Sequence, residues 1–306
     1  MNDDILATVG VIVVNYGSHE LVEDNLTQTV GDAFPGYVAV VDSWSSSEER
    51  RDVEAMCELH GWHAISPPGN PGFGGGCNLG ASAALGAGAT ALVFVNPDAY
   101  LPLDDLRALA QSVLQDPAQV RAPVVVRPDG SHFASLADLL IERGQTRARF
   151  RSPAGPPPGS RPWVSGACFA IAASMWTTIG GFDEDYFLYW EDVDLSRRVV
   201  MAGGEPRVDP SCQAVHDEGG THRGTTPSRA KSPVYYYYNV RGRLTYARKH
   251  LGRRDRRRWV LTTPVVAYRV LLEGGRRQLI HPRRTWWPAL RGAIDGFRGR
   301  TGPRYP

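Results

Sequence analysis

The stretch VGVIVVNYGS (residues 9–18) decides the fold class, because it is an apolar run that ends in turn residues. A continuous run of β-branched residues is typical of a strand buried on both faces, as in a parallel sheet. YVAVVDS (residues 37–43) and ALVFVNPDA (residues 91–99) have the same character. A further strand is expected in WVSGACFAIA (residues 163–172).

Helical segments separate these strands. We predict helices over about residues 19–30, 48–60 and 78–85, and a later one from about Glu191 to Gly203. Alternating strands and helices predict an α/β fold with a doubly wound, mostly parallel sheet, flanking helices and right-handed crossovers. Ligands bind beyond the carboxyl ends of such strands. The polar residues at these ends are Asn15, Asp42, Asn96 and Asp98.

The segment NPGFGGGCNLG (residues 70–80) is the most unusual local feature, since five of its eleven residues are glycine. A dinucleotide fingerprint, G-x-G-x-x-G, fails on spacing, because its last position falls on Cys77 or Leu79. The Gly-Lys-Ser/Thr ending of a P-loop is also missing. We therefore predict a glycine-rich loop that leads into a helix and allows close approach of another group. A plain tight turn is the alternative.

The strand-end carboxylates have two readings each. Asp42 fits either a hydrogen-bond acceptor for a ribose or base, or an N-cap of the next helix. Asp98 in Asn-Pro-Asp fits either a ligand of Mg²⁺ or Mn²⁺ or ordinary turn chemistry.

The segment YWEDVDL (residues 189–195) places Glu191, Asp192 and Asp194 directly after an aromatic run. Acids in the first turn of a helix often interact only with its dipole. Adjacent acids beside apolar rings are partly desolvated, which raises a carboxyl pKa and suits it to accept a proton. We favour the catalytic reading, and we expect Asp194 to cap the helix or to meet Arg197 or Arg198.

Composition limits the remaining possibilities. The 306 residues are 42% hydrophobic, which suits one large domain or a domain with an appendage. The start MNDDILATVG lacks the pattern of a signal peptide, and no apolar run is long enough to span a membrane. Four scattered cysteines suggest a reducing cytosol and neither disulfides nor a zinc site. Residues 143–162, rich in Arg, Pro and Gly, are predicted to form a mobile loop.

Charge is divided unevenly along the chain. Residues 241–306 hold 18 basic and 3 acidic side chains, whereas residues 1–240 hold 16 basic and 29 acidic ones. The arginine clusters stand beside Trp259, Trp286, Trp287 and an apolar stretch near residues 260–272, interrupted by Pro264. This pattern fits a helix at an anionic membrane surface, or a helical subdomain with solvated arginines. Nucleic acid is disfavoured, because the acidic part would repel a phosphate backbone.

Taken in order, these segments and the later GGFDEDYFLYWEDVDLSRR (residues 180–198) and His216 resemble the family-2 glycosyltransferases of the GT-A fold. The resemblance covers about residues 8–225 and is greatest to the rhamnosyltransferase-like branch, which acts on lipid-linked glycans and cell-wall or polysaccharide precursors. Two departures are Ser43-Trp44-Ser45 after Asp42, and Thr221 where the family often has serine.

The resemblance implies roles for particular residues. Asp98 would bind a divalent cation, Mn²⁺ or Mg²⁺, on the donor diphosphate, with His216 in support. Asp192 would be the catalytic base, and Glu191 would orient the loop or contact the acceptor. The expected donor-binding residues are Asn15, Asp42, Asn70, Gly72, Phe73, Gly74, Asn78, Asn96, Gly166 and Asp183.

These residues predict an inverting, metal-dependent glycosyltransferase. It would use a nucleotide-sugar donor, with rhamnose as a candidate sugar, and a glycan or polyprenyl-linked acceptor. An inactive nucleotide-sugar-binding protein and a sugar-nucleotide pyrophosphorylase are the alternatives. We expect a catalytic GT-A domain over residues 1–232 and a basic helical extension over residues 233–306. A cytoplasmic protein at the inner face of the plasma membrane would fit both parts.

Overall fold

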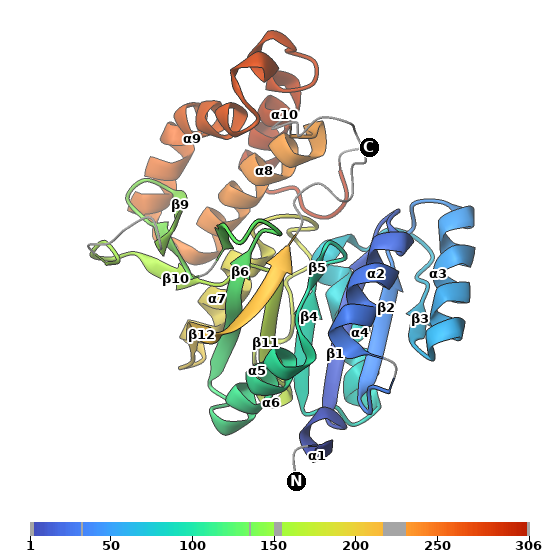
Figure 1. Ribbon diagram of the computed structural model, residues 1–306. Helices are drawn as coiled ribbons and strands as arrows, with labels where there is room; N and C mark the ends of the chain where they lie inside the picture. Colours follow the sequence, from blue (N-terminus) through green and yellow to red (C-terminus); the bar gives the residue numbers. More distant parts are fainter. Residues whose placement is uncertain (1–2, 32, 135, 150–154, 217–230, 305–306) are drawn as a thin grey trace.

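The computed structural model describes residues 3–31, 33–134, 136–149, 155–216 and 231–304, and consists of a large mixed sheet, flanking helices and a C-terminal group of helices (Figure 1). The short helix α1 (Asp3–Leu6) precedes the first strand. In Figure 1 the C-terminal helices stack at one end of the sheet.

The main sheet has the strand order β3-β2-β1-β4-β11-β6-β12-β5, with β7 paired to β6. Strands β3, β2, β1 and β4 run parallel to one another, and β6 runs parallel to β12, whereas β11 is antiparallel to both β4 and β6. The predicted α/β class is therefore confirmed. The strands are β1 (Val9–Asn15), β2 (Tyr37–Asp42), β3 (His63–Ile65), β4 (Ala91–Val95), β5 (Ala99–Tyr100), β6 (Gln119–Val126), β7 (His132–Ala134), β11 (Cys168–Ala172) and β12 (Glu205–His216).

Helices cover both faces of this sheet. Val11 and Val13 of β1 face one apolar layer, which α2, α3 and α5 complete. Ile12 and Val14 face the other, which α4, α6 and α7 complete. Successive side chains of the strand thus point into two different apolar layers, as a doubly wound sheet requires. The helices are α2 (His19–Val30), α3 (Ser47–His60), α4 (Gly72–Gly86), α5 (Leu103–Gln115), α6 (Ala173–Ile179) and α7 (Glu191–Met201).

The glycine-rich segment is not a loop, because α4 already begins at Gly72. A Cβ atom on Gly76 would lie 2.7 Å from Val14 Cγ1, and one on Gly80 would lie 2.5 Å from Ile12 Cγ2. The glycines therefore let α4 lie directly on β1. This packing outweighs the low helix propensity of glycine, which is why the predicted start near residue 78 was wrong.

Residues 143–162 are also not a loop throughout. A second sheet, ordered β10-β8-β9, combines β8 (Ala137–Leu140), β9 (Gln145–Ala148) and β10 (Arg161–Trp163). The buried Asp138 accepts hydrogen bonds from Arg149 Nη2 at 2.6 Å and Nε at 3.1 Å. Arg149, which lies in the segment predicted to be a mobile loop, thus pairs within this sheet. Residues 150–154 lie outside the described part of the chain.

The C-terminal helices pack on the rest of the chain. They are α8 (Pro233–His250), α9 (Arg253–Glu273), the 3₁₀ helix η2 (Arg276–Ile280) and α10 (Trp286–Phe297). Trp259 and Tyr246 share an apolar cluster with Tyr186 and Trp190. The expectation that the arginines here are merely solvated is wrong for Arg243, which is buried and donates to the carbonyls of Gly144 and Trp259, both at 2.9 Å. The division at residue 232 stays a prediction.

None of the helices that the structure describes combines the length and the apolar character needed to cross a bilayer. Pro264 lies inside α9, within the stretch that the sequence showed to be most apolar.

Candidate active site

Sheet pairing brings Asp98 and His216 together. His216, the last residue of β12, lies opposite Ala99 of β5, and Asp98 directly precedes that strand. His216 Nε2 lies 3.1 Å from Asp98 Oδ1, and the two side chains are 7% and 15% exposed. The Phe133 ring stacks on the imidazole with centroids 4.5 Å apart. The two residues predicted to serve one cation are therefore neighbours in a largely buried position.

This pair fits a divalent cation that is shared with a bound phosphate. A carboxylate oxygen and an imidazole nitrogen are accepted ligands of Mn²⁺, and Mg²⁺ takes carboxylate oxygen. The buried Nδ1 of His216 has no hydrogen-bond partner. Over the residues described, no cluster of three His, Cys, Asp or Glu forms a closed metal cage. Such an ion would complete its coordination from the phosphates of a ligand and from water.

A three-residue turn connects this pair to the predicted base. The turn, Ser165, Gly166 and Ala167, lies between β10 and β11. Asn96, next to β4, donates its backbone N–H to the Ala167 carbonyl at 2.9 Å. Gly166 donates its backbone N–H to Asp192 Oδ2 at 3.2 Å. Asp192 and the strand end that carries Asp98 thus border the same turn.

Asp192 has the environment of a proton acceptor. Its Oδ1 accepts the Val193 N–H at 2.8 Å, and Oδ2 accepts the N–H of Gly166. Burial raises the pKa of Asp192 to about 6, although these backbone N–H groups act in the opposite direction. A carboxylate with a pKa near the working pH is well suited to general-base chemistry.

Glu191 differs from its neighbour. The residue is 6% exposed, and its Oε2 has no hydrogen-bond partner. Burial, together with the negative charge of Asp192, raises the pKa of Glu191 well above its usual value. A protonated Glu191 would donate a hydrogen bond and would not remove a proton.

Asp194 is fully buried and has three partners. Its carboxylate accepts from Tyr186 Oη at 3.0 Å and Arg198 Nε at 2.6 Å, and lies 2.6 Å from His250 Nε2. Burial alone would raise the pKa of Asp194, but its bonds to His250 and Arg198 bring it below the usual value. The expected contact with Arg198 is present. Asp194 joins the aromatic run to α7 and α8, which is a structural role.

A cavity of about 390 Å³ opens beside the two acids. Its walls come from β10, α7, α8 and α9, so the C-terminal helices complete it. Sequence reasoning missed these walls, because the tyrosine run of α8 and Trp163 carry no recognisable motif. The wall residues used below are Glu191, Asp192, Trp163, Tyr189, Tyr235, Asn239, Ala267 and Arg269.

Asp42 is the last residue of β2 and lies opposite Asn15, at the carboxyl-end edge of the parallel strands β2, β1 and β4. Its Oδ2 accepts from Arg50 Nε at 3.0 Å, whereas the buried Oδ1 has no partner. The Arg50 guanidinium stacks over the Trp44 ring at 4.4 Å, and Trp44 is 40% exposed. Arg50 was not anticipated from the sequence. Its position on the first turns of α3, eight residues after Asp42, was the only available signal.

Several predicted donor-binding residues contact their own chain. Asn15 Nδ2 donates to Glu49 Oε1 at 2.7 Å, and Asn70 Oδ1 accepts the Gly72 N–H at 2.8 Å. Asn78 Nδ2 donates to the Phe182 carbonyl at 2.9 Å. Asp183 pairs with Lys249 of α8. These bonds shape the surroundings of the site, and donor contacts of these residues stay predictions.

The N-terminal turn of α4 lies close to the site. Gly72 has φ of +77°, and a Cβ there would lie 2.3 Å from the Phe187 carbonyl oxygen. Phe73 donates its N–H to that carbonyl at 2.9 Å, and a Cβ on Gly166 would lie 3.3 Å from the Phe73 ring. A Cβ on Gly74 would lie 3.0 Å from Phe182. The groups closest to Gly72 and Gly74 are thus Phe187 and Phe182, in the segment that leads to α7.

Comparison with known proteins places this site in context. No protein-family model matches the chain. The low-salt glycan biosynthesis hexosyltransferase Agl10 of Haloferax volcanii is 24% identical over 97% of this chain and 94% of its own length. The N-acetylglucosaminyl-diphospho-decaprenol L-rhamnosyltransferase of Mycobacterium tuberculosis is 32% identical, over 41% of this chain and 46% of its own length.

The fold is shared with solved structures. The mannosyltransferase PcManGT from Pyrobaculum calidifontis, solved with GDP-Man and Mn²⁺, aligns with a TM-score of 0.56 at 17% identity, over 95% of this chain and 87% of that one. The resemblance to a GT-A glycosyltransferase that the sequence motifs indicated is thereby confirmed. The chain therefore has the fold of the GT-A glycosyltransferases, and along nearly its whole length it is similar in sequence to a hexosyltransferase.

Proposed function

We propose that the chain is an inverting, divalent-cation-dependent glycosyltransferase. It would move a hexose, with rhamnose as the first candidate, from a nucleotide-sugar donor to a lipid-linked glycan acceptor. One observation carries the proposal: the Ser165–Gly166–Ala167 turn contacts Asp192 through Gly166 and, through Ala167, contacts Asn96, two residues before the Asp98 that pairs with His216. A cation-binding pair and a base on two sides of one turn are what displacement at an anomeric carbon requires.

The residues divide the chemistry between them. Asp98 and His216 would hold the cation, which, when bound, would stabilise the negative charge of the diphosphate leaving group. Asp192 takes the proton of the acceptor hydroxyl at its carboxylate, because a free hydroxyl is a poor nucleophile. The attack on the anomeric carbon comes from the face opposite the diphosphate. This geometry inverts the configuration of the transferred sugar.

The donor nucleoside would lie near Asp42. Its unpartnered Oδ1 is a free acceptor for a base or ribose donor, and the exposed Trp44 ring beside it offers a stacking surface. Arg50 holds both groups in place through its ion pair and its stacking contact. Trp44 follows Asp42 closely where related sequences often have smaller residues, which suggests a base site particular to this chain.

The acceptor would occupy the 390 Å³ cavity beside Asp192. Trp163, Tyr189 and Tyr235 offer flat apolar faces for a sugar ring, while Asn239 and Glu191 offer hydrogen-bonding groups. The Mycobacterium tuberculosis relative is named for an acceptor carried on diphospho-decaprenol. A lipid-linked acceptor also agrees with a peripheral place at a membrane for the basic C-terminal helices.

A thermal-shift screen of the full chain tests this function. A donor at 100 times its dissociation constant should stabilise the fold by about 2.7 kcal/mol, which corresponds to roughly 5 °C for a chain of this size. The shift should need Mn²⁺ or Mg²⁺ and should be confined to one or a few nucleotide sugars. Unchanged melting with every nucleotide sugar, with or without the cation, would contradict the proposal. A shift without any donor turnover would instead favour an inactive binding protein.

A further inference from the structure

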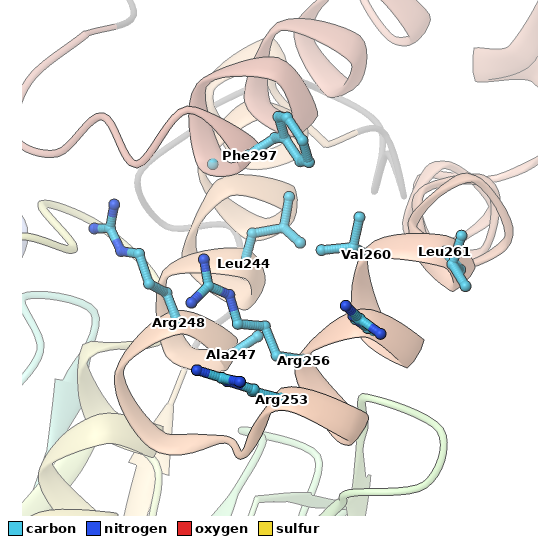
Figure 2. A pocket seen from close by; sticks show the side chains of 10 residues that line it. Leu244, Ala247, Arg248, Arg253, Arg256, Val260, Leu261 and Phe297 are labelled. Atoms are coloured by element: carbon cyan, nitrogen blue, oxygen red, sulfur yellow. The ribbon is translucent and has the colours of Figure 1, made fainter.

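A second cavity, of about 550 Å³, lies between α8, α9 and α10, away from the candidate active site. We call it the arginine groove. Figure 2 shows Arg253 and Arg256 on one side of it and Phe297 and Val260 on the other, so that charged and apolar walls face the same space. The residues that line the groove are Leu244, Ala247, Arg248, Arg253, Arg256, Arg257, Val260, Leu261, Gly296 and Phe297.

The positive charge of the groove is costly for the fold. Five of the first six residues of α9 are arginine, with Asp255 as the sole exception. The N-terminus of a helix disfavours positive charge, and neighbouring like charges repel each other. Asp255 pairs with Arg258, at 3.7 Å, and no carboxylate of the described residues pairs with Arg253, Arg256 or Arg257. Such a cluster is better explained by an anion that binds there than by folding.

The apolar residues of the groove are open to water. Leu261 is 79% exposed and Phe297 is 72% exposed. Further apolar side chains of the same helices are exposed nearby in sequence, namely Val265, Trp287, Leu290 and Ile294. Inorganic phosphate or a phosphorylated peptide would use the arginines but would leave these side chains in water. A phosphate group that carries aliphatic chains would satisfy both walls.

The groove is separate from the candidate acceptor cavity. The two share no lining residue. Arg257 and Ala267, which line one each, are ten residues apart on α9, or about 15 Å along the helix axis. A headgroup held at the arginines would thus lie in a different cavity from the one beside Asp192. The occupant of the groove is therefore distinct from the reacting acceptor.

We propose that the arginine groove binds the phosphate headgroup of an anionic membrane phospholipid. The guanidinium groups of Arg253, Arg256 and Arg257 contact the phosphate, while Leu261 and Phe297 enter the boundary of the acyl chains. The site would fix one orientation of the protein on a bilayer surface. The inference goes beyond glycosyl transfer and does not depend on which donor is used.

Flotation of the full chain with phospholipid vesicles tests the groove. Wild type should float with vesicles that contain phosphatidylglycerol and remain unbound with pure phosphatidylcholine. The triple variant Arg253→Gln, Arg256→Gln, Arg257→Gln should partition roughly 10²-fold less, because each basic residue at the surface contributes about one factor of five. Glutamine keeps part of the side-chain stem, and removal of charge at a helix N-terminus should not lower the melting temperature.

The matched control is the triple variant Arg276→Gln, Arg277→Gln, Arg283→Gln, which removes the same charge outside the groove. The partitioning of this control onto anionic vesicles should fall at most a few-fold. If vesicle binding falls equally in the two triple variants, the attraction is diffuse and the proposed phospholipid site in the arginine groove is wrong. Equal binding of wild type to both kinds of vesicle would also contradict the proposal. Donor hydrolysis should be the same in all three proteins, so this outcome is independent of the enzymatic proposal.

The apolar wall needs its own variant. Leu261→Ser with Phe297→Ser keeps every arginine, and its vesicle binding should fall at least tenfold. If this variant binds anionic vesicles normally while 10 mM glycerol phosphate releases the wild type, the groove is a site for free phosphate and the lipid assignment is wrong.

Discussion

Replacing Asp192 with asparagine is expected to lower glycosyl transfer by roughly 10²–10⁴-fold, the usual contribution of a general base. Donor affinity should change little, because the Asp192 contacts run to the Gly166 turn and to the start of α7. Asparagine keeps an oxygen that can accept the Val193 N–H, but its second group cannot accept from Gly166. The cost to stability should be small, because a charge that burial disfavours is removed at the same time.

The neighbouring acids supply the controls. Glu191→Gln replaces a group whose pKa is raised well above its usual value by burial and by the charge of Asp192, and which is therefore a poorer candidate base, so turnover should fall by less than about tenfold. Asp194→Asn breaks charged hydrogen bonds to Arg198 and His250, each worth about 1.5–3 kcal/mol. That variant should have a lower melting temperature, and any loss of activity should follow from unfolding of the protein.

The assay is the initial rate of nucleoside diphosphate release at saturating donor and acceptor, with donor affinity measured separately by calorimetry. In wild type the rate should fall as the pH drops through about 6, because Asp192 must be unprotonated to act. Near-normal turnover in Asp192→Asn, with loss of turnover in folded Glu191→Gln or Asp194→Asn, would refute the assignment of the base.

Three further predictions concern the fold and the cation. Gly72→Ala should lower the free energy of unfolding by about 2–4 kcal/mol through its positive φ and its clash with Phe187, whereas Gly86→Ala in the same helix, with open space around it, should be neutral or stabilising; equal denaturation midpoints would contradict this. The raised pKa of Glu191 means that wild type loses stability from this group as pH rises above about 4.3, by up to about 1.4 kcal/mol per unit, whereas Glu191→Gln keeps only the smaller loss that comes from Asp192; a difference between their unfolding free energies that stays constant with pH would exclude it. Asp98→Asn should weaken Mn²⁺-dependent donor binding at least about tenfold in calorimetry and leave metal-free binding unchanged, and an unaltered titration would remove Asp98 from the cation site.

Much of the parallel half of the sheet could be predicted from the sequence. The β1 strand, α2 and β4 coincide with the expected segments, because continuous buried runs end there in turn residues. The proximity of Asp98 and His216 agrees with the shared cation role that the family resemblance implied. These features depend on local pattern, and the pattern of an apolar strand followed by a polar residue is unambiguous.

The failures have a common physical cause, which is packing between distant segments. Gly76 and Gly80 are helical because β1 lies against them, and no local signal records that contact. Arg149 lay in a predicted mobile loop and Arg243 in a helical segment whose arginines could be solvated, yet each has partners far along the chain or across a strand pair. The walls of the acceptor cavity come from α8 and α9, which the motifs of the resembling family do not cover.

The least expected group near the strand ends is Asp42 with Arg50 and Trp44. The ion pair uses one carboxylate oxygen and leaves the other free, and the guanidinium fixes the exposed indole ring. This arrangement is the basis on which we propose a nucleoside site beside Asp42 and Trp44.

The most direct test of the account is ¹H NMR of the sugar's anomeric proton during turnover of a nucleotide sugar, with Mn²⁺ and a short-chain prenyl-diphosphate-linked sugar as acceptor. The account predicts a product whose anomeric configuration is opposite to that of the donor. This product should form with wild type, disappear when the cation is chelated, and form at least about 10²-fold more slowly with Asp192→Asn. A product of retained configuration, or equal rates with wild type and Asp192→Asn, would contradict the central claim that Asp192 activates the acceptor opposite a cation held by Asp98 and His216.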